Sequence, residues 1–311
     1  MCGIAGYLTR GDDPEPVGRI MLDMLTSLAR RGPDSVGLAL YRTEPSYRET
    51  CWIRLPATGE AGAHEQRILA GLAAIADVGE LRRVAGLLRI ELATDADPAA
   101  IRAAVEVDGS DVEVVSLGRQ SELVKQVGDP AELESSFAVR GFRGSHAIGH
   151  TRLSTESRVD LTHSQPFWAR GVLDVATVHN GHITNYDRMR RIAEQRGTRF
   201  FSENDSEIIG VYLAEQLERG RSLEEALEAS LHDFDGSFTY LVATAEGIGY
   251  ARDPFALKPL VIVETDEFVA VANEEIAIRA ALGPRGMARE PSGNVWGLWR
   301  RDETAARAGA A

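Results

Sequence analysis

The chain has 311 residues, of which 44% are hydrophobic and 26% charged, a composition typical of a globular protein with a buried core. Its formal net charge of −13 argues against nucleic acid as a partner, because phosphate binding needs clustered Lys and Arg. No apolar stretch approaches the roughly 20 residues that span a bilayer, and the first residues lack the pattern of a secretory signal. We therefore predict a cytoplasmic protein that does not bind membranes.

The first 41 residues predict a strand, a helix and a second strand. The strand starts at the terminus and runs to Leu8, and apolar residues recur at helical spacing over residues 17–29. The helix must end at Arg31-Gly32-Pro33-Asp34, because proline biases the residue before it away from helix. A strand then follows over residues 36–41.

The character of the sequence changes over residues 56–144. Strands and helices alternate there, which predicts a small α/β insert with a core of its own and without a chemical motif. The expected elements are a helix over 64–75, a strand over 84–92, a helix from Asp97-Pro98, a strand over 112–117 and a short helix over 121–127.

The remaining residues return to closely spaced strands. Strands are expected at 147–153, 172–178, 236–244, 247–251, 260–264 and 268–272. Helices are expected at 183–196 and 206–218, with a third opened by a capping box at Ser222. The spacing is too short for repeated βαβ units, so we predict an α+β architecture with antiparallel sheets, ending in a frayed tail.

Cys2 and Cys51 are the two cysteines, which is more typical of a reducing compartment than of a disulfide framework. Cys51 is expected to be a small buried residue near a strand. Cys2 differs because removal of Met1 would leave a free α-amine on the same residue as the thiol. Such an amine titrates at about 7.7–8.0 and is a competent base near neutral pH. Alone, Cys2 is weak evidence, since many proteins begin Met-Cys by chance.

Five short motifs occur in a fixed order along the chain. They are Met1-Cys2-Gly3-Ile4-Ala5-Gly6, Arg31-Gly32-Pro33-Asp34, Gly149-His150-Thr151-Arg152, His179-Asn180-Gly181 and Asn204-Asp205-Ser206-Glu207. In this order the chain resembles the class II glutamine amidotransferases, which are N-terminal-nucleophile hydrolases. Arg252-Asp253-Pro254 and Lys258-Pro259-Leu260 look like the amidophosphoribosyltransferase version. The resemblance covers about residues 2–41 and 142–277.

The resemblance implies a role for each motif in hydrolysing the side-chain amide of L-glutamine. Cys2 would be the nucleophile, and the amide of Asn180 with the backbone N–H of Gly181 would form the oxyanion hole. By itself, Asn-Gly favours a hairpin turn over such a site. Arg152 would bind the α-carboxylate of glutamine and Asp205 its α-ammonium group, although a surface ion pair is the commoner fate of either residue.

Further residues are placed near the site by the same resemblance. Arg31 would order the loop around the nucleophile, and His179 would neighbour the substrate. Leu153 departs from the aromatic residue that many relatives carry there. No metal is expected: His146 and His150 suit zinc only on a helix, and their segment reads as a strand. Acidic or thiolate ligands at a recognisable spacing are also lacking for His163, His179 and His182.

The resemblance implies the four-layer α-β-β-α sandwich of N-terminal-nucleophile hydrolases, without a cofactor. The glutaminase domain is expected over residues 2–290, interrupted by the insert at about 56–144 and followed by a tail over 291–311. Because nothing after residue 277 could hold a synthase, we expect a stand-alone subunit of the glutamate synthase or N-methylglutamate synthase type, which passes ammonia to a separate synthase. The alternatives are an amidase of the same class that acts on another amide, and an inactive regulatory subunit.

Overall fold

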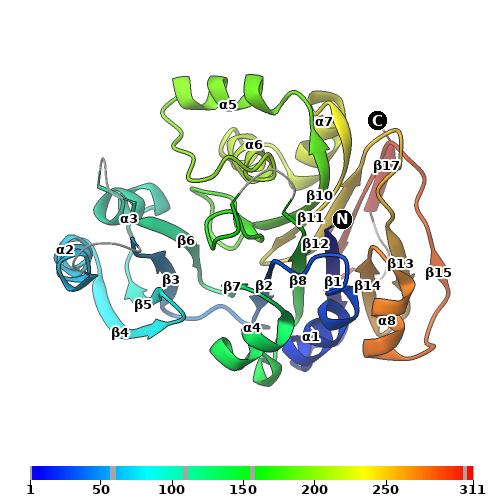
Figure 1. The fold of residues 1–311 in the computed structure, drawn as a ribbon, viewed down its shortest axis with the longest axis horizontal. Coiled ribbons are helices and arrows are strands. Elements are labelled where there is room, and N and C mark those ends of the chain that lie inside the picture. Colours follow the sequence, from blue (N-terminus) through cyan, green and yellow to red (C-terminus); the bar gives the residue numbers. More distant parts are fainter. Residues whose placement is uncertain (1, 57–60, 108–110, 155–157, 304–306, 311) are drawn as a thin grey trace.

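The computed structural model describes residues 2–56, 61–107, 111–154, 158–303 and 307–310. Two antiparallel sheets pack on each other through contacts of β1 and β8 with β10, β11 and β12, and helices cover their outer faces (Figure 1). The chain thus has the α-β-β-α sandwich that the sequence predicted. A smaller sheet lies beside the sandwich, where the insert was expected (Figure 1).

The seven-stranded sheet carries the N-terminus on an interior strand. Strand β1 lies between β14 and β8, and all of its residues are buried because the sheet is covered on both faces. In spatial order the strands are β15 (Ala288–Arg289), β13 (Val261–Glu264), β14 (Phe268–Ala272), β1 (Gly3–Thr9), β8 (His146–Arg152), β2 (Ser35–Tyr41) and β7 (Ser121–Val127).

The six-stranded sheet includes residues that were expected to form the tail. Within 291–311, two strands extend the sheet, because Trp296 and Leu298 pack into the core on one side and Trp299 packs into the core on the other. Large aromatic residues stabilise such a strand by the area they bury. The spatial order is β17 (Arg307–Ala310), β16 (Val295–Arg300), β12 (Gly247–Arg252), β11 (Gly236–Thr244), β10 (Ala176–Ile183) and β9 (Phe167–Trp168).

Helices form the two outer layers. On the seven-stranded sheet, α1 (Val17–Leu28) packs against β1 and β8, and α8 (Glu275–Leu282) packs against α1. On the six-stranded sheet, α6 (Glu207–Glu218) contacts β9 and β10, and α7 (Leu223–Asp233) contacts β12 and β16. The remaining elements of these layers are α4 (Pro130–Phe137), the 3-10 turn Val139–Gly141 and α5 (Tyr186–Gln195). The capping box expected at Ser222 is present at the start of α7.

The insert departs from its prediction in two ways. Residues 121–127 form β7 rather than a helix, because they pair with β2 at the edge of the seven-stranded sheet. The insert also has no separate core, since its buried residues belong to the same hydrophobic cluster as β1 and α1. Its sheet has the order β4 (Asp77–Val84), β5 (Leu87–Ala93), β3 (Glu49–Arg54) and β6 (Glu113–Gly118), with helices α2 (Ala61–Ala73) and α3 (Pro98–Val105).

None of the described helices is both long and apolar enough to cross a membrane.

Candidate active site

Cys2 immediately precedes β1 and lies beside the end of β8. Its Sγ is 3.8 Å from the carbonyl oxygen of Leu153, and its side chain is partly buried. Burial raises the pKa of the Cys2 thiol, while the nearby charge of Arg152 lowers this pKa and that of Asp205 raises it. The thiol is therefore close enough to both charged groups to be influenced by them.

Contacts from two segments hold the chain at the nucleophile. The Arg31 Nε donates to the carbonyl oxygen of Cys2 at 3.2 Å, and the Arg31 guanidinium also pairs with the carboxylate of Glu274. The backbone N–H of Asn273 donates to the carbonyl of Ile4 at 3.1 Å, and its side-chain amide donates to the carbonyl of Pro259 at 2.7 Å. Arg31 thus lies where the sequence predicted, whereas the contributions of Asn273 and Glu274 were not foreseen.

The Arg31-Gly32-Pro33-Asp34 turn lies against the end of β8. The backbone N–H of Asp34 donates to the carbonyl of Arg152 at 2.9 Å, and the carboxylate of Asp34 accepts from the N–H of Ser154 at 2.7 Å. This turn therefore sets the path of the chain that carries Arg152 past Cys2.

Gly32 provides a test of this packing. A Cβ added there would lie 2.4 Å from the carbonyl carbon and oxygen of Thr151, which belong to the backbone of β8. We expect Gly32→Ala to lower the free energy of unfolding by about 1–3 kcal/mol, since backbone must move to accommodate the methyl group. Thermal denaturation would measure the loss. Gly62→Ala is the matched control, because nothing lies within 4 Å of its added Cβ.

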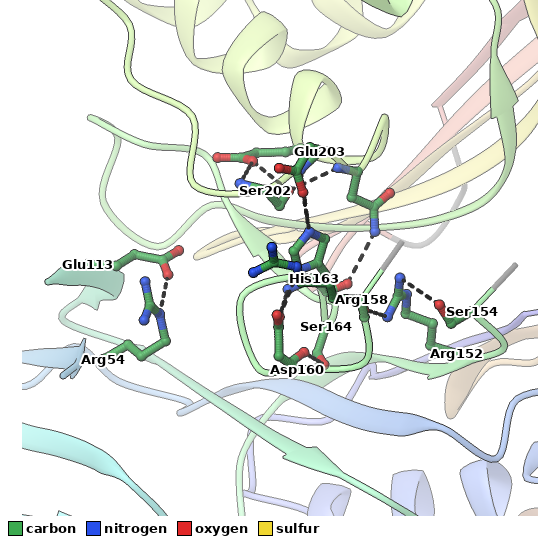
Figure 2. Close-up of polar contacts among 12 residues, drawn as sticks. Arg54, Glu113, Arg152, Ser154, Arg158, Asp160, His163, Ser164, Ser202 and Glu203 are labelled. Carbon is green, nitrogen blue, oxygen red and sulfur yellow. Dashed lines mark hydrogen bonds and ion pairs between the residues drawn. The ribbon is translucent and has the colours of Figure 1, made fainter. Parts of the chain in front are cut away.

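Arg152 ends β8 with its guanidinium buried beside the nucleophile. Its Nη1 donates to the carbonyl of Arg158 at 2.8 Å and its Nη2 to the hydroxyl of Ser154 at 3.4 Å (Figure 2). Burial lowers the pKa of Arg152, and the neighbouring Cys2 and Asp160 oppose this shift. A planar cation at this place is suited to bind a carboxylate.

The side chain of Asn180 is buried within the six-stranded sheet. It lies within β10, opposite Thr239 of β11, so the Asn-Gly pair is part of a strand and not a hairpin turn. Asn180 is 3% exposed, and its Nδ2 has no hydrogen-bond partner among the described residues. Because an unsatisfied buried donor costs about 1–3 kcal/mol, such a group suggests an acceptor that arrives with a ligand.

Gly181 follows with a backbone that favours glycine. Its φ is +149°, and a Cβ there would lie 2.2 Å from the carbonyl oxygen of Ser237. The N–H of such a residue can be presented to a ligand without a side chain in the way.

The backbone before Asn180 is held by a residue that the sequence analysis did not single out. The side chain of Gln165 bonds both backbone groups of His179, accepting from its N–H at 2.6 Å and donating to its carbonyl at 3.3 Å. Gln165 also donates to the hydroxyl of Ser206 at 3.0 Å, which in turn lies 2.8 Å from the His179 Nδ1. No sequence motif pointed to Gln165, because its role depends on contacts with two distant segments.

Two histidines within these motifs are buried, and burial favours their neutral form. Burial lowers the pKa of His150 to about 3, and its Nε2 donates to the carbonyl of His179 at 3.2 Å. Burial also lowers the pKa of His179, against the opposing charge of Asp205. The Nε2 of His179 has no partner among the described residues and would lie 2.9 Å from a Cβ at Gly181. His179 is thus placed beside Gly181 as an uncharged side chain.

Asp205 lies just before α6 and faces the end of β10. Its carboxylate accepts from the backbone N–H of Ile183 at 2.8 Å and lies 3.5 Å from the His182 Nδ1. Its charge acts on both Cys2 and His179, which places it between the two halves of the site. In the part of the chain that the structure describes, no group of three or more His, Cys, Asp or Glu side chains could hold a metal ion.

The structure therefore brings the predicted residues together from two sheets. Cys2 and Arg152 lie at the ends of strands in the seven-stranded sheet, and Arg31 lies in the turn between α1 and β2. The other four lie on β10 or before α6. The Arg252-Asp253-Pro254 motif is structural: the buried carboxylate of Asp253 accepts from the N–H groups of Phe238 and Phe255 at 2.9 and 2.8 Å.

Comparisons with known proteins relate the chain to the glutamine amidotransferases. Residues 150–280 match the family model described as "Glutamine amidotransferase domain". The chain is 37% identical over 281 residues to the glutamine amidotransferase-like protein GlxB of Rhizobium meliloti, covering 89% of this chain and 91% of that protein. It is 28% identical to an amidophosphoribosyltransferase of Methanocaldococcus jannaschii, over 52% of this chain and 34% of that protein.

A solved structure shares the fold. The glutamine phosphoribosylpyrophosphate amidotransferase from B. subtilis superposes with a TM-score of 0.63 at 19% identity, covering 99% of this chain and 49% of that one. At this identity the likeness concerns the fold alone.

Proposed function

The chain belongs to the class II glutamine amidotransferases, a family of enzymes, and from this we propose that it hydrolyses L-glutamine to glutamate and ammonia through a thioester on Cys2. The observation that carries the proposal is the buried amide of Asn180, whose Nδ2 has no partner among the described residues, together with a partly buried thiol that is influenced by a cation and an anion. An amide donor aimed at no protein acceptor is what an oxyanion hole requires before substrate arrives.

The proposed mechanism begins once Met1 has been removed. The α-amine of Cys2 takes the thiol proton, and the sulfur attacks the side-chain amide carbon of glutamine. Asn180 and the N–H of Gly181 stabilise the resulting oxyanion. The carbon–nitrogen bond then breaks, the proton passes to the leaving nitrogen and ammonia departs. Water attacks the thioester and releases glutamate, which restores the thiol.

Substrate recognition rests on the two charged groups near the thiol. Arg152 would form a bidentate contact with the α-carboxylate, for which a planar guanidinium is better suited than an ammonium. Asp205 would bind the α-ammonium group. Arg31 would hold the backbone of Cys2, and His179 would line the site next to Gly181. This set favours free glutamine over a peptide amide, whose α-groups are uncharged.

We further propose that the ammonia passes to a separate synthase subunit. Support comes from the length of the match to GlxB, which covers most of both chains, and from the much longer amidophosphoribosyltransferase, of which the chain covers only 34%. Co-purification from the native source should recover a synthase-sized partner, and its absence under gentle conditions would contradict this part of the proposal.

The glutaminase proposal is tested with a diazoketone that mimics glutamine. We expect release of ammonia from L-glutamine and, after treatment with the diazoketone, one adduct that peptide mapping assigns to Cys2. Intact-mass measurement of the untreated protein should show that Met1 is absent. A protein that retains Met1 yet releases ammonia would contradict the amine base, and labelling without any glutaminase activity would favour an amidase with another substrate.

A further inference from the structure

His163 lies beside the candidate site with each of its ring nitrogens against a carboxylate. Its Nδ1 is 2.7 Å from Asp160 and its Nε2 is 2.8 Å from Glu203, and only 5% of its side chain is exposed (Figure 2). The two acids come from different loops, one before β9 and one before α6. His163 therefore bridges two segments that are 40 residues apart in the sequence.

One of these segments contains the backbone carbonyl that accepts a hydrogen bond from the Arg152 guanidinium. The carboxylate of Asp160 accepts from both the backbone N–H and the ring of His163, at 2.9 and 2.7 Å, and its carbonyl accepts from the Ser164 hydroxyl at 2.6 Å. These bonds close a compact turn over residues 160–164. Arg158, two residues earlier, offers its carbonyl to the Arg152 guanidinium at 2.8 Å (Figure 2). The turn therefore fixes an acceptor for Arg152.

The other segment carries Asp205. Glu203 binds the ring of His163, and the Asn204 side chain donates to the His163 carbonyl at 3.1 Å. Asn204 also accepts from the N–H of Ser206 at 3.1 Å, so the residues on both sides of Asp205 are tied to His163 directly or through one step.

We propose that His163 is a positioning residue, which holds the guanidinium of Arg152 and the carboxylate of Asp205 at the spacing that the α-groups of an amino acid require. The inference rests on the proposed function, because that function assigns these two groups to glutamine. It goes further by naming a residue that touches neither the substrate nor the nucleophile and yet sets the affinity for substrate.

Both ring nitrogens of His163 take part in the bridge, since each lies within hydrogen-bond distance of a carboxylate oxygen. The hydrogen bond from His163 lowers the pKa of Glu203. Burial raises the pKa of Asp160, but the hydrogen bonds from His163 have the larger effect, so the pKa of Asp160 is lowered overall. A cavity of about 830 Å³ is lined by His163, Asp160 and Glu203 and by other charged residues: Arg54, Arg83, Asp111 and Arg158.

The test compares His163→Asn with His232→Asn, a change at an exposed histidine of α7. The asparagine amide can still reach Asp160 but is too short for Glu203. We expect the KM for glutamine to rise about tenfold, as for the loss of one charge-assisted hydrogen bond, with kcat changed less than about threefold.

Two further measurements make the result decisive. Glu203 is 77% exposed, so Glu203→Gln should fold normally, raise KM in the same direction and combine non-additively with His163→Asn. Glutamine binding by calorimetry in a Cys2→Ala background separates affinity from turnover. An unchanged KM and affinity in both variants, or a loss confined to kcat, would overturn the inference while leaving the proposed function intact. A wild-type protein that does not bind glutamine would overturn both.

Discussion

Replacing Cys2 with alanine should reduce the release of ammonia from glutamine by a factor on the order of 10⁴–10⁶, as for the loss of a covalent nucleophile. The reason is that Asn180 and Arg152 can bind the substrate but supply no group that attacks it. The fold should persist, because Cys2 precedes β1 and its side chain is only partly buried. Ammonia release in a coupled assay measures the activity, and circular dichroism with thermal melting verifies folding.

Cys51 offers the matched control for this prediction. It is the other free thiol, it is fully buried in β3 of the smaller sheet, and burial raises its pKa far above the ordinary value for a thiol. Cys51→Ala should therefore leave activity unchanged and lower the free energy of unfolding by about 1 kcal/mol through the small cavity it creates. Substantial activity in Cys2→Ala, or a comparable loss of activity in Cys51→Ala, would contradict the assignment of the nucleophile.

The motifs predicted a set of candidate site residues because each motif is short and local. The fold places these residues on or next to two sheets that pack on each other. The local sequence could not show whether Asn180 lies in a turn or a strand. Asn-Gly favours a turn, and only pairing with β11 makes this segment a strand. Residues 121–127 were misassigned for the same reason, since a seven-residue amphipathic stretch fits a strand or a helix until its partner is known.

The supporting residues were missed because their partners are distant in sequence. Asn273 contacts Ile4 only because β14 pairs with β1, and Gln165 contacts His179 only because the loop before β9 folds onto β10. The sequence around His163 has no acidic residue at a spacing typical of a metal site. One of its two carboxylates follows 40 residues later, and the other lies three residues before it. Neither spacing is typical of a metal site, and only the fold brings both carboxylates to the His163 ring.

The second large effect is expected at Asn180, whose amide should matter in the transition state more than in the ground state. Asn180→Ala should lower kcat about 10²–10³-fold and leave the KM for glutamine within a few-fold, because the oxyanion exists only once the thiol has attacked. Steady-state kinetics separates the two parameters. The control is Asn185→Ala, since the Asn185 side chain bonds the backbone near Asp233 and Asp235 at the surface, away from Cys2.

The alternative for Asn180 is a purely structural role, and the two roles predict opposite patterns. Because its Nδ2 has no partner among the described residues, removing the amide should break no hydrogen bond of that nitrogen and should change the free energy of unfolding little. A structural role would instead lower the melting temperature and raise KM as Gly181 and His179 moved. A variant that is less stable but has full kcat would therefore rule out the oxyanion hole, whereas a stable variant with a low kcat requires that Asn180 acts on charge formed during the reaction.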